Sequence, residues 1–163
     1  MVTGFYMTTP KLFLLTGIPG TGKTTYGDDL AKLFGFAHYD IEDPATGERL
    51  ISDSTSFIQE LLRHGKDTVV TWGFNPVHQP SVSAVLQLKN SGFKLIWFDG
   101  NRPAALRAFI KRATVPEVCF YLQMYRIEVM EIINTVKPAI VNPFNEQGQF
   151  KSAEELLQEL RRS

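Results

Sequence analysis

Short apolar runs alternate with amphipathic stretches along the chain. The runs are too short for helices and are rich in β-branched and aromatic residues, which is typical of buried strands. They predict strands at 12–15, 36–40, 68–72, 95–98 and 139–141. Between them, apolar residues that recur every three or four positions predict helices at 26–34, 57–62, 80–90, 106–113, 118–136 and 152–160.

This alternation indicates the fold class. A helix between two successive strands acts as a crossover, so the strands run parallel and the helices cover both faces of the sheet. We therefore expect an α/β protein built in three layers. A chain of 163 residues buries about two-thirds of its unfolded surface in one core, so we expect residues 1–163 to form a single domain.

The composition excludes several classes of protein. With 44% hydrophobic and 21% charged residues, the chain is neither disordered nor fibrous. Its 17 basic and 17 acidic residues cancel, which argues against a dedicated nucleic-acid binder. No apolar run approaches the roughly 20 residues of a membrane span, so we expect no membrane partner. The single cysteine, Cys119, excludes an internal disulfide, fits a cytoplasmic protein and is expected to be buried.

The segment after the first predicted strand carries the clearest chemistry. Residues 17–24 match G-x-x-x-x-G-K-T between a strand and a helix. Small residues let successive backbone N–H groups turn inward around a phosphate, and the start of the following helix adds its positive end. We therefore expect a nucleoside triphosphate site formed by Gly17, Pro19, Gly20, Thr21, Gly22, Lys23, Thr24 and Thr25.

Two residues of this segment have defined chemical roles. Lys23 would place a positive charge on the β- and γ-phosphates during catalysis, and Thr24 would offer its hydroxyl to Mg²⁺. ATP and Mg²⁺ are therefore the expected cofactors. The motif does not say whether the phosphate moves to water or to another molecule. However, the rest of the chain leaves little room for the sensor segments of switches and motors, which favours a kinase of small molecules.

From Lys11 to Leu160 the chain resembles the small P-loop kinases, the group of adenylate, shikimate and gluconate kinases. The resemblance rests on the phosphate loop, on the acidic stretch 39–43 after the second strand, and on the arginine-bearing helix after the fourth. Across that last segment the chain is similar to gluconate kinase, including Gln123 beyond the helix. The resemblance implies a P-loop NTPase fold with five parallel strands in the order 2-3-1-4-5 and a short helical lid at about 112–117.

The resemblance also implies roles for three residues outside the loop. Asp40, at the end of the second strand, would bind the acceptor hydroxyl, either as a catalytic base or by holding it in line with the γ-phosphate. Arg112 would reach over the phosphates from the lid as a catalytic residue, and Arg107 would bind the nucleotide. Glu42 and Asp43 could contact Mg²⁺ through water, although Asp43-Pro44 is also ordinary turn chemistry.

The acceptor pocket is expected after the third strand, at Trp72, Gly73, Phe74 and Asn75. Aromatic rings would supply contact area and Asn75 directional hydrogen bonds, but Trp72 and Phe74 could equally belong to the core. This stretch lacks the Ser and basic residues of gluconate kinase and the glycine run of shikimate kinase. The resemblance therefore does not identify the acceptor. Asp99 resembles a second metal-binding acid, yet we expect it to cap the next helix.

These observations favour an ATP-dependent phosphotransferase that moves the γ-phosphate of MgATP to a small hydroxyl- or phosphate-bearing acceptor. A sugar acid, a nucleoside or nucleotide, and an antibiotic hydroxyl all remain open, as does the oligomeric state. One alternative is a nucleotide-binding module that hydrolyses ATP slowly and acts through a partner. The other is a polynucleotide end kinase, against which the neutral charge counts.

Overall fold

The computed structural model describes residues 8–163. Strands and helices alternate along this part of the chain. Their bounds are β1 Leu12–Gly17, α1 Lys23–Phe34, β2 Ala37–Asp40, α2 Pro44–Ser52, α3 Ser54–Arg63, β3 Thr68–Thr71, α4 Gln79–Asn90, β4 Lys94–Phe98, α5 Arg102–Arg112, α6 Val118–Val129, α7 Ile132–Val136, β5 Ala139–Val141 and α8 Ala153–Arg162.

The strands form one parallel sheet in the order β2-β3-β1-β4-β5, as the resemblance implied. β1 therefore lies in the middle, between β3 and β4. Its carboxyl end leads directly into the phosphate loop. Leu15 of β1 is level with Thr71 of β3, and Thr71 is in turn level with Asp40 of β2. The ends of three neighbouring strands thus meet at one edge of the sheet.

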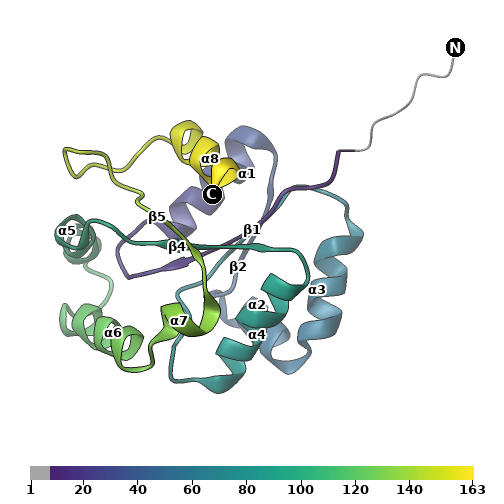
Figure 1. The fold of residues 1–163 in the computed structure, drawn as a ribbon, viewed down its shortest axis with the longest axis horizontal. Coiled ribbons are helices and arrows are strands. Elements are labelled where there is room, and N and C mark those ends of the chain that lie inside the picture. Colours follow the sequence, from purple (N-terminus) through teal and green to yellow (C-terminus); the bar gives the residue numbers. More distant parts are fainter. Residues whose placement is uncertain (1–7) are drawn as a thin grey trace, which may run out of the picture.

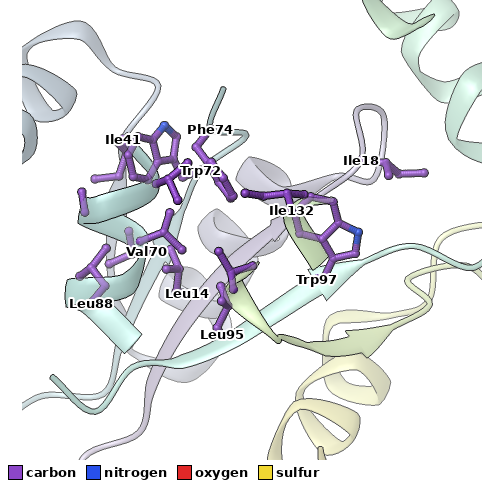
Figure 2. Packing of buried hydrophobic residues seen from close by; sticks show 14 of the residues in the cluster. Leu14, Ile18, Ile41, Val70, Trp72, Phe74, Leu88, Leu95, Trp97 and Ile132 are labelled. Atoms are coloured by element: carbon purple, nitrogen blue, oxygen red, sulfur yellow. The ribbon is translucent and has the colours of Figure 1, made fainter. Parts of the chain in front are cut away.

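Helices cover both faces of the sheet (Figure 1), so the expected three layers are confirmed. Because side chains alternate along a strand, Phe13 and Leu15 of β1 pack in the core beneath α1 and α8. Leu14 points the other way, into the larger core that includes α3 and α4. Figure 2 shows this second core, in which Trp72 and Phe74 also lie.

One helix was missed by the sequence analysis. α2 follows β2 almost at once, where only a turn was considered. The Asp43 side chain accepts a hydrogen bond from the Thr46 backbone N–H at 3.2 Å, and Pro44 occupies the first turn. An Asp that caps a helix with Pro behind it is a helix start, so Asp43-Pro44 carried the signal.

The expected helix over 118–136 is wrong, because the chain breaks it in two. Glu131 takes a left-handed conformation with φ of 47°, which ends α6 and starts α7. The predicted apolar face of α6 is also the exposed one: Val118, Leu122, Tyr125 and Val129 face outward. The side chains that pack inward are Phe120, Met124 and Ile127.

Three smaller expectations also fail. Asp99 does not cap α5; the Asn101 side chain does, accepting from the Ala104 N–H at 3.1 Å, and Asp99 pairs with Arg102 instead. The segment 113–117 between α5 and α6 is exposed and contains no helix of its own, so the lid is not helical there. Cys119 is exposed rather than buried, because it lies beside the outward face of α6.

Candidate functional site

The phosphate loop joins β1 to α1 and curls around an open centre. Its glycines are required by the backbone. Gly22, directly before α1, has φ of 75°, and Gly20 has φ of 77°. A side chain at Gly20 would in addition strike the carbonyl oxygen of Ala105 on α5. The Thr21 hydroxyl donates to the Ile18 carbonyl at 2.8 Å, which closes the turn.

A cavity of about 240 Å³ opens over this loop. The loop supplies one wall. The other walls come from the segments that follow β2 and β3, from α5 and α6, and from the segment between these two helices. They bring together residues far apart in the sequence. The lining consists of Gly17, Pro19, Gly20, Thr21, Gly22, Lys23, Thr24, Glu42, Gly73, Phe109, Arg112, Thr114, Val115 and Gln123.

Lys23 is the basic centre of this cavity. Its ammonium group donates to the Ile18 carbonyl at 2.9 Å and lies 3.4 Å from the Thr21 hydroxyl. Desolvation lowers the pKa of Lys23 to about 8, and the positive charge of Arg112 adds to the lowering, while Glu42 opposes it. An anion in the cavity would therefore meet an ammonium group that is held in place and poorly hydrated.

Asp40 and Thr24 face each other across the base of the loop. The Thr24 hydroxyl donates to Asp40 Oδ2 at 3.3 Å, and the Glu42 backbone N–H donates to Asp40 Oδ1 at 3.1 Å. β3, the strand next to the loop, ends in Thr71 and supplies no acid there. The carboxylate beside Thr24 comes from β2, one strand further out.

Glu42, not Asp40, lines the cavity itself. Its Oε1 accepts the Gly73 backbone N–H at 2.9 Å, which fixes the carboxylate opposite Lys23. A Cβ at position 73 would come within 2.6 Å of that oxygen, so only glycine there leaves room for the Glu42 carboxylate. The sequence analysis considered Glu42 only for Mg²⁺, because the acidic stretch contains several carboxylates and the pattern does not rank them.

A second cavity of about 400 Å³ lies on the other side of the loop, between α1, α5 and the segment before α8. Its lining includes the expected Thr25, together with Lys111 and the ring of Phe150, both of which the sequence analysis missed. Arg112 borders both cavities, and its contact with the phosphates stays a prediction.

The structure brings some sequence-predicted residues together and separates others. Arg107 lies outside the lining of both cavities, next to Gly148. Of the expected acceptor residues, only Gly73 reaches the cavity. Trp72 and Phe74 are 8% and 3% exposed and pack against each other in the core, as Figure 2 shows. Asn75 accepts the Val77 N–H in its own loop, at 3.1 Å.

Gln123, which the resemblance to gluconate kinase included without giving it a role, lies at the cavity wall. Its side-chain amide donates to the Phe74 carbonyl at 2.9 Å, which ties α6 to the segment after β3. This hydrogen bond adds to the core packing of α6 and fixes Gln123 at the cavity wall.

The oxygen ligands at this site fit Mg²⁺. Mg²⁺ keeps several waters and is held by one or two oxygen side chains together with substrate phosphates, which a hydroxyl and a carboxylate at 3.3 Å can provide. Among residues 8–163 no cluster of three or more His, Cys, Asp or Glu side chains could hold a metal by itself. In the same range, no helix has the length and apolar character needed to cross a membrane.

Solved structures of other proteins share this architecture. A shikimate kinase from Acinetobacter baumannii in complex with shikimate superimposes with a TM-score of 0.59 at 18% identity, and the match covers 96% of each chain. The chain has the fold of the small P-loop kinases. A shikimate kinase from Bacteroides thetaiotaomicron gives a TM-score of 0.58 at 17% identity, covering 94% of this chain and 99% of that chain.

A gluconokinase from Sinorhizobium meliloti shares this small P-loop kinase fold, with a TM-score of 0.53 at 16% identity and coverage of 93% of this chain and 90% of that chain. No protein-family model and no curated protein sequence matches. The likeness therefore lies in the three-dimensional arrangement, and no particular member of the group is singled out.

Proposed function

We propose that the protein is an ATP-dependent phosphotransferase that moves the γ-phosphate of MgATP to a hydroxyl group of a small acceptor. One observation carries the proposal: the phosphate loop and Lys23 share a single cavity with the carboxylate of Glu42. A carboxylate across the cavity from Lys23 is placed to hold and deprotonate a hydroxyl that attacks the γ-phosphate. The same group would also serve an attacking water, so the acceptor pools described below separate transfer from hydrolysis.

The residues of the loop would bind the donor. The backbone N–H groups of the loop and the Lys23 ammonium would bind the β- and γ-phosphates, and Arg112 would add a second positive charge at the border of the two cavities. The base and ribose would occupy the second cavity, against Phe150. Thr24, with Asp40 beside it, would hold Mg²⁺, which would neutralise charge on the phosphates.

The geometry supports different roles for the two carboxylates. Asp40 bonds to the Thr24 hydroxyl, which favours a role on the metal side, where it accepts hydrogen bonds from bound water. Glu42 stands in the cavity, where it can accept the proton of an acceptor hydroxyl. The expectation that Asp40 binds the acceptor remains a prediction, and the variants described below separate the two assignments.

The lining of the cavity favours an uncharged acceptor. Beyond the loop it offers one carboxylate, the amide of Gln123, the hydroxyl of Thr114 and apolar surface from Phe109 and Val115. The guanidinium of Arg112 belongs to the phosphate side. A phosphate or carboxylate on the acceptor would meet Glu42 without a cation of its own, so a sugar, polyol or nucleoside hydroxyl is the better match. Movement of segment 113–117 over the cavity would exclude water.

Replacing Asp40 with Asn is expected to weaken nucleotide binding about tenfold in the presence of Mg²⁺ and to leave it unchanged in EDTA, because outer groups around a metal typically contribute that much. Titration calorimetry with a non-hydrolysable ATP analogue measures both affinities. Asp53→Asn, at an aspartate that caps α3 by accepting the Ser56 backbone N–H at 3.1 Å, serves as the control. Equal losses with and without Mg²⁺ would argue against the metal-side role.

Nucleotide affinity is expected to fall as the pH rises above about 8. In the free protein the pKa of Lys23 is lowered to about 8, so the amine is mostly neutral above that pH. Bound phosphates favour the charged ammonium form. Nucleotide binding at pH 9 should therefore be coupled to the uptake of a proton. Above pH 8 the affinity should fall about tenfold for each pH unit. Calorimetry at pH 7 and 9 in buffers of different ionisation enthalpy measures both effects. A Lys23→Ala variant that keeps the same pH dependence would contradict the assignment.

Transfer itself is tested by ATP consumption with pools of sugars, polyols, nucleosides, sugar acids, nucleoside monophosphates, aminoglycosides and oligonucleotides, beside a control without acceptor. We expect rapid turnover with one of the uncharged hydroxyl pools. Turnover that depends on oligonucleotides would indicate a polynucleotide end kinase. Slow hydrolysis that is indifferent to every pool would overturn the proposal and favour a nucleotide-binding module.

A further inference from the structure

A chain of hydrogen bonds leads from the surface of α1 to Asp40. His38 of β2 has a side chain that is only 9% exposed. Its Nδ1 lies 2.9 Å from Oδ1 of Asp28, and its Nε2 lies 2.8 Å from the hydroxyl of Thr71. The Thr71 hydroxyl in turn lies 3.5 Å from Asp40 Oδ1. Through the Thr71 hydroxyl, the largely buried imidazole of His38 is therefore linked to Asp40, the acid beside Thr24.

The place of the imidazole is made by α1. Gly27 faces the ring, and a Cβ there would come within 2.6 Å of His38 Cε1 and 2.7 Å of Cδ2. Gly27 has an ordinary helical backbone in the middle of α1, where glycine costs about 1 kcal/mol relative to alanine. The close approach of the ring explains why a glycine occupies this position.

The hydrogen atoms of this network can be assigned from its acceptors. A carboxylate only accepts, so in the neutral form of the imidazole the ring hydrogen lies on Nδ1, toward Asp28. Nε2 then accepts, and the single hydroxyl hydrogen of Thr71 must point to it. The same hydrogen cannot also serve Asp40. The distances agree, since 2.8 Å is a full hydrogen bond and 3.5 Å is the weak limit of one.

We propose that His38 is a positioning residue that, held by Asp28, draws the Thr71 hydroxyl away from Asp40 and so leaves the Asp40 carboxylate free for the magnesium side of the site. The inference rests on the proposed function, because it assigns Asp40 to that side. Thr71 is fully buried and has no other acceptor within reach among its contacts in residues 8–163. Asp40 Oδ1 already accepts the Glu42 backbone N–H, so it has one acceptor site left. Without His38 the Thr71 hydroxyl would turn to Oδ1 and take that site from metal-bound water.

The test measures the affinity for a non-hydrolysable ATP analogue with Mg²⁺ and with EDTA. His38→Ala should weaken binding about fivefold with Mg²⁺, which is the value of one net hydrogen bond, and should not change it in EDTA. Thr71→Val removes the competing hydroxyl and should by itself bind as the wild type does. In the double variant of His38→Ala with Thr71→Val, the lost affinity should return, because nothing is left for His38 to restrain.

The matched control is Thr68→Val, another buried threonine of β3, whose hydroxyl donates to the Lys66 carbonyl at 2.9 Å away from the site. Combined with His38→Ala, it should restore nothing. Gly27→Ala displaces the His38 ring and should lower the Mg²⁺-dependent affinity as His38→Ala does. It replaces His38→Ala in the experiment if that variant does not melt cooperatively.

Two results would overturn the inference: wild-type affinity with Mg²⁺ in folded His38→Ala or Gly27→Ala, or failure of Thr71→Val to restore any affinity to His38→Ala. The latter would mean that His38 acts through packing. Failure of the proposed function looks different: the wild-type protein would bind the analogue with Mg²⁺ and yet transfer no phosphate to any acceptor pool, whereas the role of His38 is read from affinity alone.

Discussion

Replacing Lys23 with alanine is expected to lower kcat for phosphate transfer on the order of a thousandfold, the usual loss when one preorganised group that faces developing charge is removed. The ammonium group is held by the Ile18 carbonyl at 2.9 Å, inside the loop, before any substrate arrives. Its electrostatic contribution therefore needs little reorganisation at the moment of transfer. Steady-state turnover of ATP with the active acceptor pool measures the loss.

Lys32→Ala is the matched control, because Lys32 is an exposed lysine on the same helix and lies away from the loop. It should retain wild-type turnover. A thermal melt must show that the Lys23 variant is folded, so that a lost activity is not a lost fold. A folded Lys23→Ala protein that still transfers phosphate within tenfold of the wild-type rate would exclude the loop as the catalytic centre.

Glu42→Gln is expected to reduce kcat by a factor of about 10² to 10⁴, the range for a positioned general base, and to leave nucleotide affinity close to that of the wild type. The amide keeps the size of the side chain and an oxygen that can accept the Gly73 N–H. It cannot take a proton from the acceptor hydroxyl. The loss should therefore appear in kcat, while the Kd for the ATP analogue with Mg²⁺ is unchanged.

Glu48→Gln, an exposed carboxylate on α2, provides the control and should behave as the wild type. The comparison with Asp40→Asn is the informative one. If Asp40 holds the acceptor, as the sequence suggested, Asp40→Asn will show the kcat defect and Glu42→Gln will not. If both variants lose only magnesium-dependent nucleotide affinity, neither carboxylate is the base and the assignment of Glu42 falls.

Local patterns in the sequence were sufficient for the frame of the molecule. All five strands lie where apolar, β-branched runs predicted them, and the phosphate loop sits between β1 and α1 as its motif required. Both signals are local: burial on both faces of a sheet selects the residues of each strand, and the conformation of the loop selects its glycines. The strand order came from the resemblance, and the structure confirms it.

The helices between the strands were harder to predict, because more than one cause can produce the same pattern. α6 carries apolar residues on two faces, and spacing alone does not say which face meets the core. The break at Glu131 leaves no mark in the composition, since a left-handed residue other than glycine is held by its surroundings. Asp43-Pro44 did carry a signal for α2, and the turn interpretation was the wrong choice between two local alternatives.

By itself, the sequence determined the fold class, the phosphate loop and the presence of carboxylates after β2. Only the tertiary structure decided which carboxylate faces the cavity, that Trp72 and Phe74 belong to the core, and that His38 reaches Thr71. The physical reason is the range of the interactions. Strands and phosphate loops are specified by neighbours along the chain, whereas the direction of a side chain at a strand end depends on residues that only folding brings beside it.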